Sequence, residues 1–224
     1  MVAALTIPSL IQKHQEKVTV AKLKKVYSAV SQAYMRAEQE NGDIGTWGFN
    51  PGVRRGQDGK LTQVVYDNEK LFWSKLIPYM QVDSICFNNT DGKCTLKKSE
   101  FSLNEVNRSN NTAPATTNIK LTDGTMLAGG WIQEPYCPAN TYCGDFYVDI
   151  NGNENPPNTI GKDVFYFIIM KNKIVPWGND ERRFSTRCLN NGDGYGCTAW
   201  VIYNENMDYL HCNDLSWNGK HKCK

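Results

Sequence analysis

The chain has 224 residues, of which 40% are hydrophobic and 21% are charged. This balance excludes general disorder and suffices for a sizeable core, within one elaborated domain or at most two small ones. The formal net charge of +2 lacks the strong basic excess of a nucleic-acid binder, so we expect no nucleic-acid partner.

The first 42 residues predict one long helix. Nothing breaks a helix from Pro8 to Glu40, and Asn41-Gly42 suits a left-handed C-cap. Apolar residues recur in steps of three and four at Leu23, Val26, Tyr27, Val30, Ala33, Tyr34 and Ala37. A helix of this length spans about 50 Å, so we divide the chain into a helix, residues 1–41, and a head domain, residues 42–224.

The head carries eight cysteines, and none lies in the first 85 residues. CxxC-like zinc spacing is absent, so an even number of cysteines favours up to four disulfides and an oxidising compartment. Joining each cysteine to its neighbour is the simplest pairing: Cys86–Cys94, Cys137–Cys143, Cys188–Cys197 and Cys212–Cys223. The alternative is a zinc site made of His211, Cys212, His221 and Cys223.

The head is predicted to contain loops, a short helix and a sheet. Residues 42–59 are rich in Gly, Asp and Asn and predict a surface loop that Trp47 and Phe49 anchor. Residues 69–82 show helical spacing, with Asn68 available as the N-cap and an end near Pro78. Short β-forming runs from about 118 to 177 predict four or five antiparallel strands. The fold class is therefore α+β, a long helix followed by a small antiparallel sheet with disulfide-rich loops. Residues 197–210 fit either a helix or a strand.

One segment, VDINGNENPPNTIGKDVFYF (148–167), has the composition of a cation-binding loop. Oxygen-bearing side chains alternate at Asp149, Asn151, Asn153 and Asn155, and Asp163 follows. Hard oxygen ligands at alternate positions are how a loop wraps Ca²⁺, although the spacing is not that of an EF-hand. The alternative is a tight Asn/Gly turn whose side chains cap their own backbone. We take Asp149, Asn151, Asn153 and Asp163 as the candidate calcium ligands.

Catalytic motifs are weak. The sequence has three histidines and no GxSxG, HExxH, P-loop or GxGxxG segment. A general acid and base could come only from scattered acids such as Asp163, Asp180 and Glu181. We therefore expect a protein that is not an enzyme, with an extracellular hydrolase as a minor alternative.

The segment VAALTIPSLIQKHQEKVTVAKLKKVYSAVSQAYMRA (2–37) resembles the N-terminal helix of type IV pilin-like proteins, the pilins and pseudopilins of bacterial filaments. The match begins at Val2–Pro8, and the family's leader, cleavage site and early glutamate are not in the sequence. The resemblance implies the type IV pilin-like fold. It also implies that some members hold calcium in a loop after the sheet.

The resemblance further implies a minor pilin or pseudopilin of a type IV pilus or a type II secretion system. Its partners would be other subunits, and before assembly the inner membrane, followed by a periplasmic or extracellular filament. The apolar start of the helix, with Leu5 and Pro8, would pack between subunits, and Pro8 would mark a kink. Val26, Val30, Ala33 and Ala37 would lie on the head's sheet. The stretch Val2–Ile11 is shorter than the roughly 20 residues that span a bilayer, so we expect a preceding segment in the exported precursor and a soluble chain without it.

A second hypothesis is a secreted adhesin module that binds sugars or a surface ligand. Stacking on Trp47, Trp131, Trp177 and Trp217 would supply the contacts. Clustering of these tryptophans on one exposed face would favour binding, and burial would remove the case.

Overall fold

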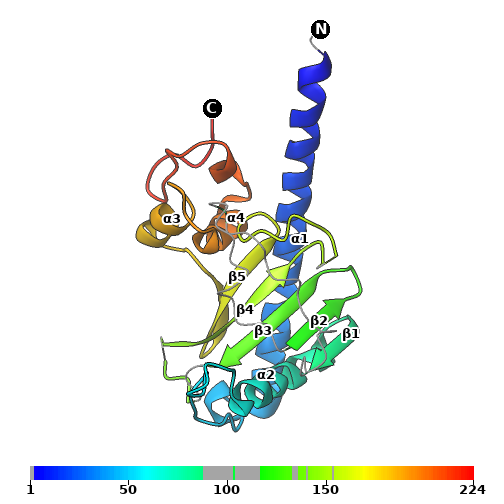
Figure 1. The fold of residues 1–224 in the computed structure, drawn as a ribbon, viewed down its shortest axis with the longest axis vertical. Helices are drawn as coiled ribbons and strands as arrows, with labels where there is room; N and C mark the ends of the chain where they lie inside the picture. Colours follow the sequence, from blue (N-terminus) through cyan, green and yellow to red (C-terminus); the bar gives the residue numbers. More distant parts are fainter. Residues whose placement is uncertain (1–2, 88–102, 104–116, 133–135, 140, 153) are drawn as a thin grey trace.

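The computed structural model describes residues 3–87, 103, 117–132, 136–139, 141–152 and 154–224, with side chains from Leu10 onward. Helix α1 (Ala3–Asn41) is one continuous element that passes through Pro8 without interruption. It ends as expected, because Gly42 has φ of 80° and its N–H donates to the carbonyl oxygen of Glu38 at 2.9 Å. Figure 1 shows the first part of α1 extending beyond the head.

The remaining α-helices are α2 (Gln63–Leu76), α3 (Glu181–Arg187) and α4 (Thr198–Asn204). Short 3-10 helices are η1 (Ile44–Thr46), η2 (Ile77–Tyr79), η3 (Tyr195–Cys197) and η4 (Asp208–Leu210). The undecided segment after Cys197 is therefore helical. Helix α3 was not predicted; Asp180 caps it by accepting from the backbone N–H of Arg183 at 2.9 Å.

Six strands form one antiparallel sheet in simple sequential order. They are β1 (Val82–Phe87), β2 (Thr117–Leu121), β3 (Met126–Ile132), β4 (Tyr142–Asp149), β5 (Val164–Met170) and β6 (Lys173–Pro176). The predicted four or five strands did not include β1. That edge strand has no buried residue, so it lacks the alternation that marks a half-buried strand.

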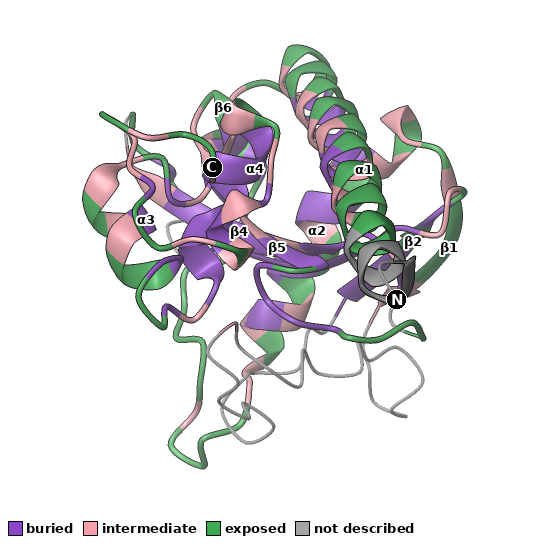
Figure 2. Cartoon of the chain, turned by 90° about the horizontal axis from the view of Figure 1, so that it is seen from above, coloured by how far each residue is buried: buried purple, intermediate pink, exposed green. Residues whose placement is uncertain are grey.

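The core lies between the sheet and the C-terminal part of α1 (Figure 2). Tyr27 of α1 stacks on Phe167 of β5 with ring centroids 5.6 Å apart, and Phe167 stacks on Phe146 of β4 at 5.4 Å. Helix α2 packs on the same face, because its Trp73 meets Phe146 edge-on at 5.5 Å. Seven α1 residues are buried on this side: Val20, Leu23, Val26, Val30, Ala33, Tyr34 and Ala37. The stripe predicted from spacing is therefore confirmed, with Tyr27 packed at its margin.

The expected N-cap of the second helix was wrong. Thr62 precedes α2, and Asn68 lies inside the helix at 1% exposure. Its side chain instead holds the preceding loop, accepting from Asn50 N–H and donating to Asn50 O, each at 2.9 Å. The loop is anchored as predicted, since Trp47 and Phe49 are both 7% exposed.

Three of the predicted disulfides are present: Cys137–Cys143, Cys188–Cys197 and Cys212–Cys223. Their Cα–Cα separations of 5.0, 4.9 and 5.9 Å lie in the usual range. Cys86 is also disulfide-bonded, and Cys94, its predicted partner, lies outside the described residues. The zinc alternative fails because the Cys212–Cys223 bond leaves no thiolate to ligate a metal.

Candidate functional site

The loop between β4 and β5 brings two aspartates together. Asp149 ends β4, Asp163 precedes β5, and the N–H of Ile150 donates to the carbonyl oxygen of Asp163 at 3.0 Å. Gly152 makes the intervening turn with φ of 79°, a conformation that L side chains rarely adopt. Closure of the loop thus places two carboxyl groups from the ends of paired strands in one buried region.

Asp149 is 1% exposed, and only one of its two carboxylate oxygens accepts a hydrogen bond from a described residue. Its Oδ1 accepts from the backbone N–H groups of Asn151 at 3.2 Å and Gly152 at 3.0 Å. Its Oδ2 is buried and has no hydrogen-bond donor among the described residues. A buried carboxylate oxygen without a donor is costly, so Oδ2 disfavours the charged form of Asp149 and has lone pairs with which it could bind a cation.

Asp163 is 4% exposed and held by the loop's own backbone. Its Oδ1 accepts from Thr159 N–H at 2.6 Å and its Oδ2 from Asn158 N–H at 2.8 Å. Burial raises the pKa of the Asp163 carboxyl, while these two amides pull it partly back. Both of its oxygens are therefore oriented by the loop, and each keeps lone-pair capacity for a cation.

Burial, and next to it the charge of Asp163, raises the pKa of Asp149 from 3.8 to about 7. The two backbone N–H groups that donate to Asp149 favour its charged form and lower the pKa by less. Burial thus disfavours the charged forms of both carboxyl groups, and each charge opposes the other. A cation would resolve the repulsion and complete the coordination of Asp149.

The asparagine side chains of the loop differ in their contacts. Asn151 donates its Nδ2 to the carbonyl oxygen of Asn155 at 3.0 Å, and its Oδ1 is buried without a donor among the described residues. Asn155 donates its own Nδ2 to Asn151 O at 2.7 Å, so it acts as a turn side chain. Asn153 lies outside the described residues. The loop therefore offers hard oxygen ligands from Asp149, Asp163 and Asn151, which is the donor chemistry that Ca²⁺ takes.

In the described part of this loop, Asp149 and Asp163 are close enough for the charge of Asp163 to raise the pKa of Asp149. Within the described part of the chain, no group of three or more His, Cys, Asp or Glu side chains could hold a metal ion. A calcium ion here would thus need the Asn151 amide, backbone carbonyls or water for its remaining ligands.

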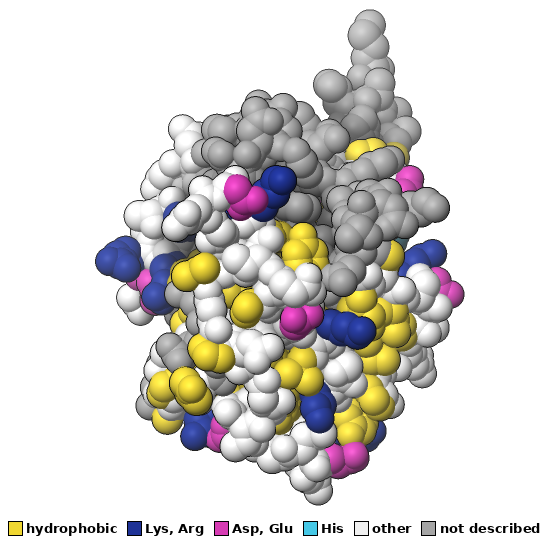
Figure 3. Space-filling model, turned by 60° about the horizontal axis from the view of Figure 1, so that its bottom comes forward, with side chains coloured by type: hydrophobic (Ala, Val, Ile, Leu, Met, Phe, Trp, Pro, Cys, Tyr) yellow, Lys and Arg dark blue, Asp and Glu magenta, His cyan; other side chains and the backbone are white. Residues whose placement is uncertain are grey.

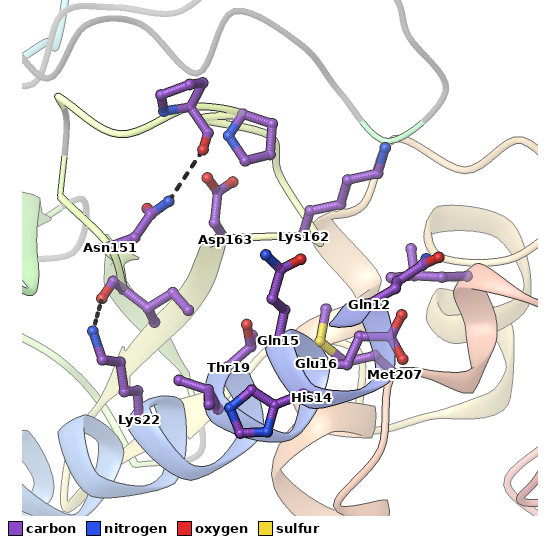
Figure 4. A pocket seen from close by; sticks show the side chains of 15 residues that line it. Gln12, His14, Gln15, Glu16, Thr19, Lys22, Asn151, Lys162, Asp163 and Met207 are labelled. Atoms are coloured by element: carbon purple, nitrogen blue, oxygen red, sulfur yellow. Dashed lines mark hydrogen bonds between the residues drawn. The ribbon is translucent and has the colours of Figure 1, made fainter. Parts of the chain in front are cut away.

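Beside this loop lies a cavity of about 710 Å³ that reaches the projecting part of α1. Figure 4 shows Gln15 of α1 pointing towards Asp163 and Lys162, with Gln12 and Lys22 to either side of it along the helix. The Lys22 ammonium also donates to the carbonyl oxygen of Ile150 at 3.4 Å (Figure 4). The aspartate loop and the emerging helix are thus in direct contact.

The predicted assembly residues fall into two groups. Val26, Val30, Ala33 and Ala37 are at most 1% exposed and pack into the chain's own core, as expected for the sheet-facing half. For Leu5 and Pro8 the structure describes only the helical backbone. Further along, Leu10 is 72%, Ile11 53% and Val18 41% exposed, so α1 presents apolar side chains beyond the head. None of the described helices combines the length and apolar character needed to cross a membrane.

The four tryptophans of the adhesin hypothesis do not form an exposed platform. Trp47 and Trp131 are 7% and 5% exposed, and the other two are partly buried. The guanidinium of Arg183 covers Trp177 at 4.2 Å, and Trp217 packs in the aromatic cluster of α3 and α4. These four tryptophans therefore do not support the adhesin hypothesis, which stays a prediction.

The acids considered as a general acid or base for hydrolysis instead accept hydrogen bonds from backbone N–H groups. Asp180 caps α3, Glu181 accepts from Trp217 N–H at 2.8 Å, and Asp163 holds its own loop. Sequence reasoning missed a different buried acid, Asp145, which accepts from the hydroxyl of Tyr142. Burial raises the pKa of the Asp145 carboxyl. The sequence signal that could have identified this buried acid is its position among the apolar residues of β4.

A family model described as a family of unknown function, DUF6613, matches residues 9–201. No curated protein matches the chain, and no solved structure matches it.

Proposed function

Because the chain belongs to DUF6613, a family of unknown function, we propose a function from its geometry: a structural subunit of a bacterial filament. The subunit is a minor pilin or pseudopilin of a type IV pilus or type II secretion system, with a type IV pilin-like fold. The coarse architecture supports this, because a long N-terminal helix lies on an antiparallel sheet with disulfide-bonded loops.

The division of α1 into two halves carries the proposal. From Val20 to Ala37 one face is buried in the head, whereas Leu10 to Val18 contains no buried residue. A helix used only for its own domain gains nothing from exposing Leu10, Ile11 and Val18. Ile11 and Val18 are seven residues apart and share one helical face, which is how a helix presents knobs to a neighbouring helix.

In this mechanism, subunits assemble by packing their projecting half-helices together. Burial of the exposed apolar side chains favours association, at about 25 cal/mol per Å² removed from water. The heads remain outside the helical core, where their disulfides resist unfolding in an oxidising compartment.

Site-specific photo-cross-linking in the native cell tests the proposal. A photoreactive residue at Leu10 should cross-link to subunits with the same kind of N-terminal helix, identified by mass spectrometry. The matched control is Val53, which is similarly exposed at 69% but lies on the head. Absence of any helix-to-helix cross-link from Leu10, together with absence of the protein from sheared filaments, would refute the proposal.

A second proposal concerns the β4–β5 loop, where we infer a Ca²⁺ site made by Asp149, Asp163 and Asn151. The support is the buried Oδ2 of Asp149, which lacks a donor among the described residues, and the raised pKa of that carboxyl. The ion would supply positive charge that lets both carboxylates ionise, and thereby brace the loop against α1. Ca²⁺ should raise the melting temperature relative to EDTA, and Mg²⁺ should do so less; no change with EDTA favours the simple Asn/Gly turn.

A further inference from the structure

The chain contains four Asn-Gly bonds, at Asn41, Asn151, Asn191 and Asn218. Asparagine is thermolabile, and it is most reactive before glycine, because the glycine nitrogen can attack the side-chain carbonyl carbon with no Cβ in the way. Whether such a bond reacts in a folded protein depends on how freely the two groups can move. The structure restrains three of these bonds and leaves the fourth much less restrained.

Asn41 is held on both sides of its bond. Its side-chain amide donates to the carbonyl oxygen of Ala37 at 2.9 Å and accepts from the ammonium of Lys75 at 2.8 Å. The N–H of Gly42, the attacking nitrogen, donates to the carbonyl oxygen of Glu38 at 2.9 Å. A reaction here would break all three hydrogen bonds and the C-terminal cap of α1.

Asn151 is held by the turn of the β4–β5 loop. The N–H of Gly152 donates to Asp149 Oδ1 at 3.0 Å. The Asn151 side chain donates to the carbonyl oxygen of Asn155 at 3.0 Å. Attack would require this loop to open, with loss of a hydrogen bond to a buried carboxyl group.

Asn191 lies in the turn after α3, where its side chain is exposed but its glycine is buried. The N–H of Gly192 donates to the carbonyl oxygen of Leu189 at 2.8 Å. A Cβ at Gly192 would lie 2.4 Å from the backbone carbonyl carbon of Arg187, so the glycine packs tightly against the end of α3. The attacking nitrogen therefore cannot turn towards Asn191 while α3 stays in place.

Asn218 differs in each of these respects. It lies at the exposed tip of the turn 216–219 in the C-terminal segment (residues 205–224), outside the sheet (Figure 1). No hydrogen bond joins its side chain to a described residue. The N–H of Gly219 donates to the carbonyl oxygen of Ser216 at 3.3 Å, which is the longest of the four and beyond the usual range. A Cβ at Gly219 would meet only the Ser216 hydroxyl, so no other element packs on this glycine.

We propose that Asn218 is a site of spontaneous deamidation in the folded protein. The Gly219 nitrogen loses its proton and bonds to Cγ of Asn218, and the Cγ–Nδ2 bond breaks with release of ammonia. Water then opens the resulting succinimide ring at either of its carbonyl carbons. Opening at Cγ gives aspartate, whereas opening at the main-chain carbon gives isoaspartate, in which the backbone runs through the former side chain.

The two products differ in their effect on the turn. Both add a negative charge, but isoaspartate also adds a methylene to the backbone. The turn is closed by the N–H of Ser216, which donates to the carbonyl oxygen of Lys220 at 3.0 Å. It positions Trp217, whose N–H donates to Glu181 Oε2 at 2.8 Å and whose ring lies 5.2 Å from that of Trp200. A longer backbone separates these partners, so isoaspartate should loosen the packing of Trp217.

The change stays local. The Cys212–Cys223 disulfide keeps the ends of the surrounding loop joined, and the contact of His211 Nε2 with Glu16 Oε1 at 2.8 Å ties the C-terminal segment to α1. One more charge is tolerated, because the surface of the head already mixes acidic and basic side chains, as Figure 3 shows for the opposite end. Aspartate should therefore leave the stability of the head unchanged, and isoaspartate should lower it.

Timed incubation of the folded protein in mildly alkaline buffer, followed by peptide mapping with mass spectrometry, tests the proposal. Asn218 should convert to two products of equal mass, which electron-transfer fragmentation distinguishes as aspartate and isoaspartate. The three held asparagines should convert at least about tenfold more slowly, because each reacts only after local opening. The matched control is the reduced, denatured chain, in which all four Asn-Gly bonds should react at similar rates.

Two variants separate the reaction from its consequence. Asn218→Gln should abolish conversion at this position, because the longer side chain would have to close a larger, less favoured ring. Asn218→Asp carries the charge without the longer backbone, so it should melt like fresh wild type, whereas aged wild type gains a lower-melting fraction. The proposal is overturned if Asn218 persists in the folded protein as long as the three held asparagines, or if one of these converts first. Identical melts of fresh and aged wild type, with isoaspartate present, would overturn the loosening of Trp217.

Discussion

Replacing Asp149 by Asn removes the charge of the buried carboxyl while keeping its shape. The amide oxygen can still accept from the backbone N–H groups of Asn151 and Gly152, which now hold Oδ1. The new NH₂ group takes the place of Oδ2, the atom without a donor among the described residues. It also meets the neighbouring Asp163 as a donor rather than as a second negative charge.

The size of the effect follows from the pKa of Asp149. A rise from 3.8 to about 7 corresponds to roughly 4 kcal/mol at 1.36 kcal/mol per unit, taken as an upper value. Between these two pH values the folded state holds a proton that the unfolded chain has released, so the stability of the wild type falls as pH rises. Without calcium, Asp149→Asn should match the wild type near pH 4 and exceed its free energy of unfolding by up to about 4 kcal/mol at pH 8.

Denaturant unfolding from pH 4 to 8, in EDTA and in excess Ca²⁺, measures this difference. Calcium should narrow this difference at pH 8, because a ligand at about 100 times its Kd stabilises the wild type by about 2.7 kcal/mol, whereas the variant has lost the charged ligand and gains less. Asp123→Asn is the control. Burial raises the pKa of Asp123, but hydrogen bonds from Lys25 and Thr125 lower it more, so the net shift is downward. That variant should lose stability at neutral pH and approach the wild type as pH falls.

Two results together would refute the reasoning: calcium does not change the free energy of unfolding of the wild type, and Asp149→Asn is less stable than the wild type at every pH. Asp149 would then be a turn residue whose charge the folded state tolerates.

Three further predictions concern the helix, the sheet and the disulfides. Leu23→Ala, at a position with 0% exposure, should lower the free energy of unfolding by about 2–5 kcal/mol, whereas Leu10→Ala should leave stability unchanged and weaken assembly in filament preparations. Gly130→Ala should destabilise by more than about 2 kcal/mol, since its φ is +103° and a Cβ would lie 2.5 Å from the indole nitrogen of Trp73; a calorimetric melt equal to the wild type contradicts this. Peptide mapping without reductant should recover Cys212 joined to Cys223, and any other partner refutes that pairing.

Much of the fold follows from patterns that repeat. The stripe from Leu23 to Ala37 was predictable because a 3.6-residue period sustained over four turns is typical of a helix with one buried face. Strands β2 to β6 were predictable from β-forming runs with turn residues between them. Edge strand β1 (Val82–Phe87) was not, because it buries no side chain and leaves no alternation in the sequence.

The candidate site was only partly predictable. The alternating oxygens after Asp149 pointed to the loop, but which oxygens lack donors depends on the closed turn. Asn68 shows the same limit: its sequence position suited an N-cap, yet its amide holds Asn50, 18 residues away. The position of the C-terminal segment beside Glu16 is a tertiary contact that no local pattern encodes.

The order of the sheet bears on how the chain matures. Each strand pairs with the one that precedes it, and the three disulfides between described residues join cysteines only 6, 9 and 11 positions apart. Short loops close at the least entropic cost, so oxidation of the unfolded chain favours these near neighbours over distant cysteines. Helix α1 packs on β5 and β6 through Tyr27, which stacks on Phe167 and donates to the carbonyl oxygen of Ile174, so the helix at the start of the chain completes its packing only once these late strands have formed.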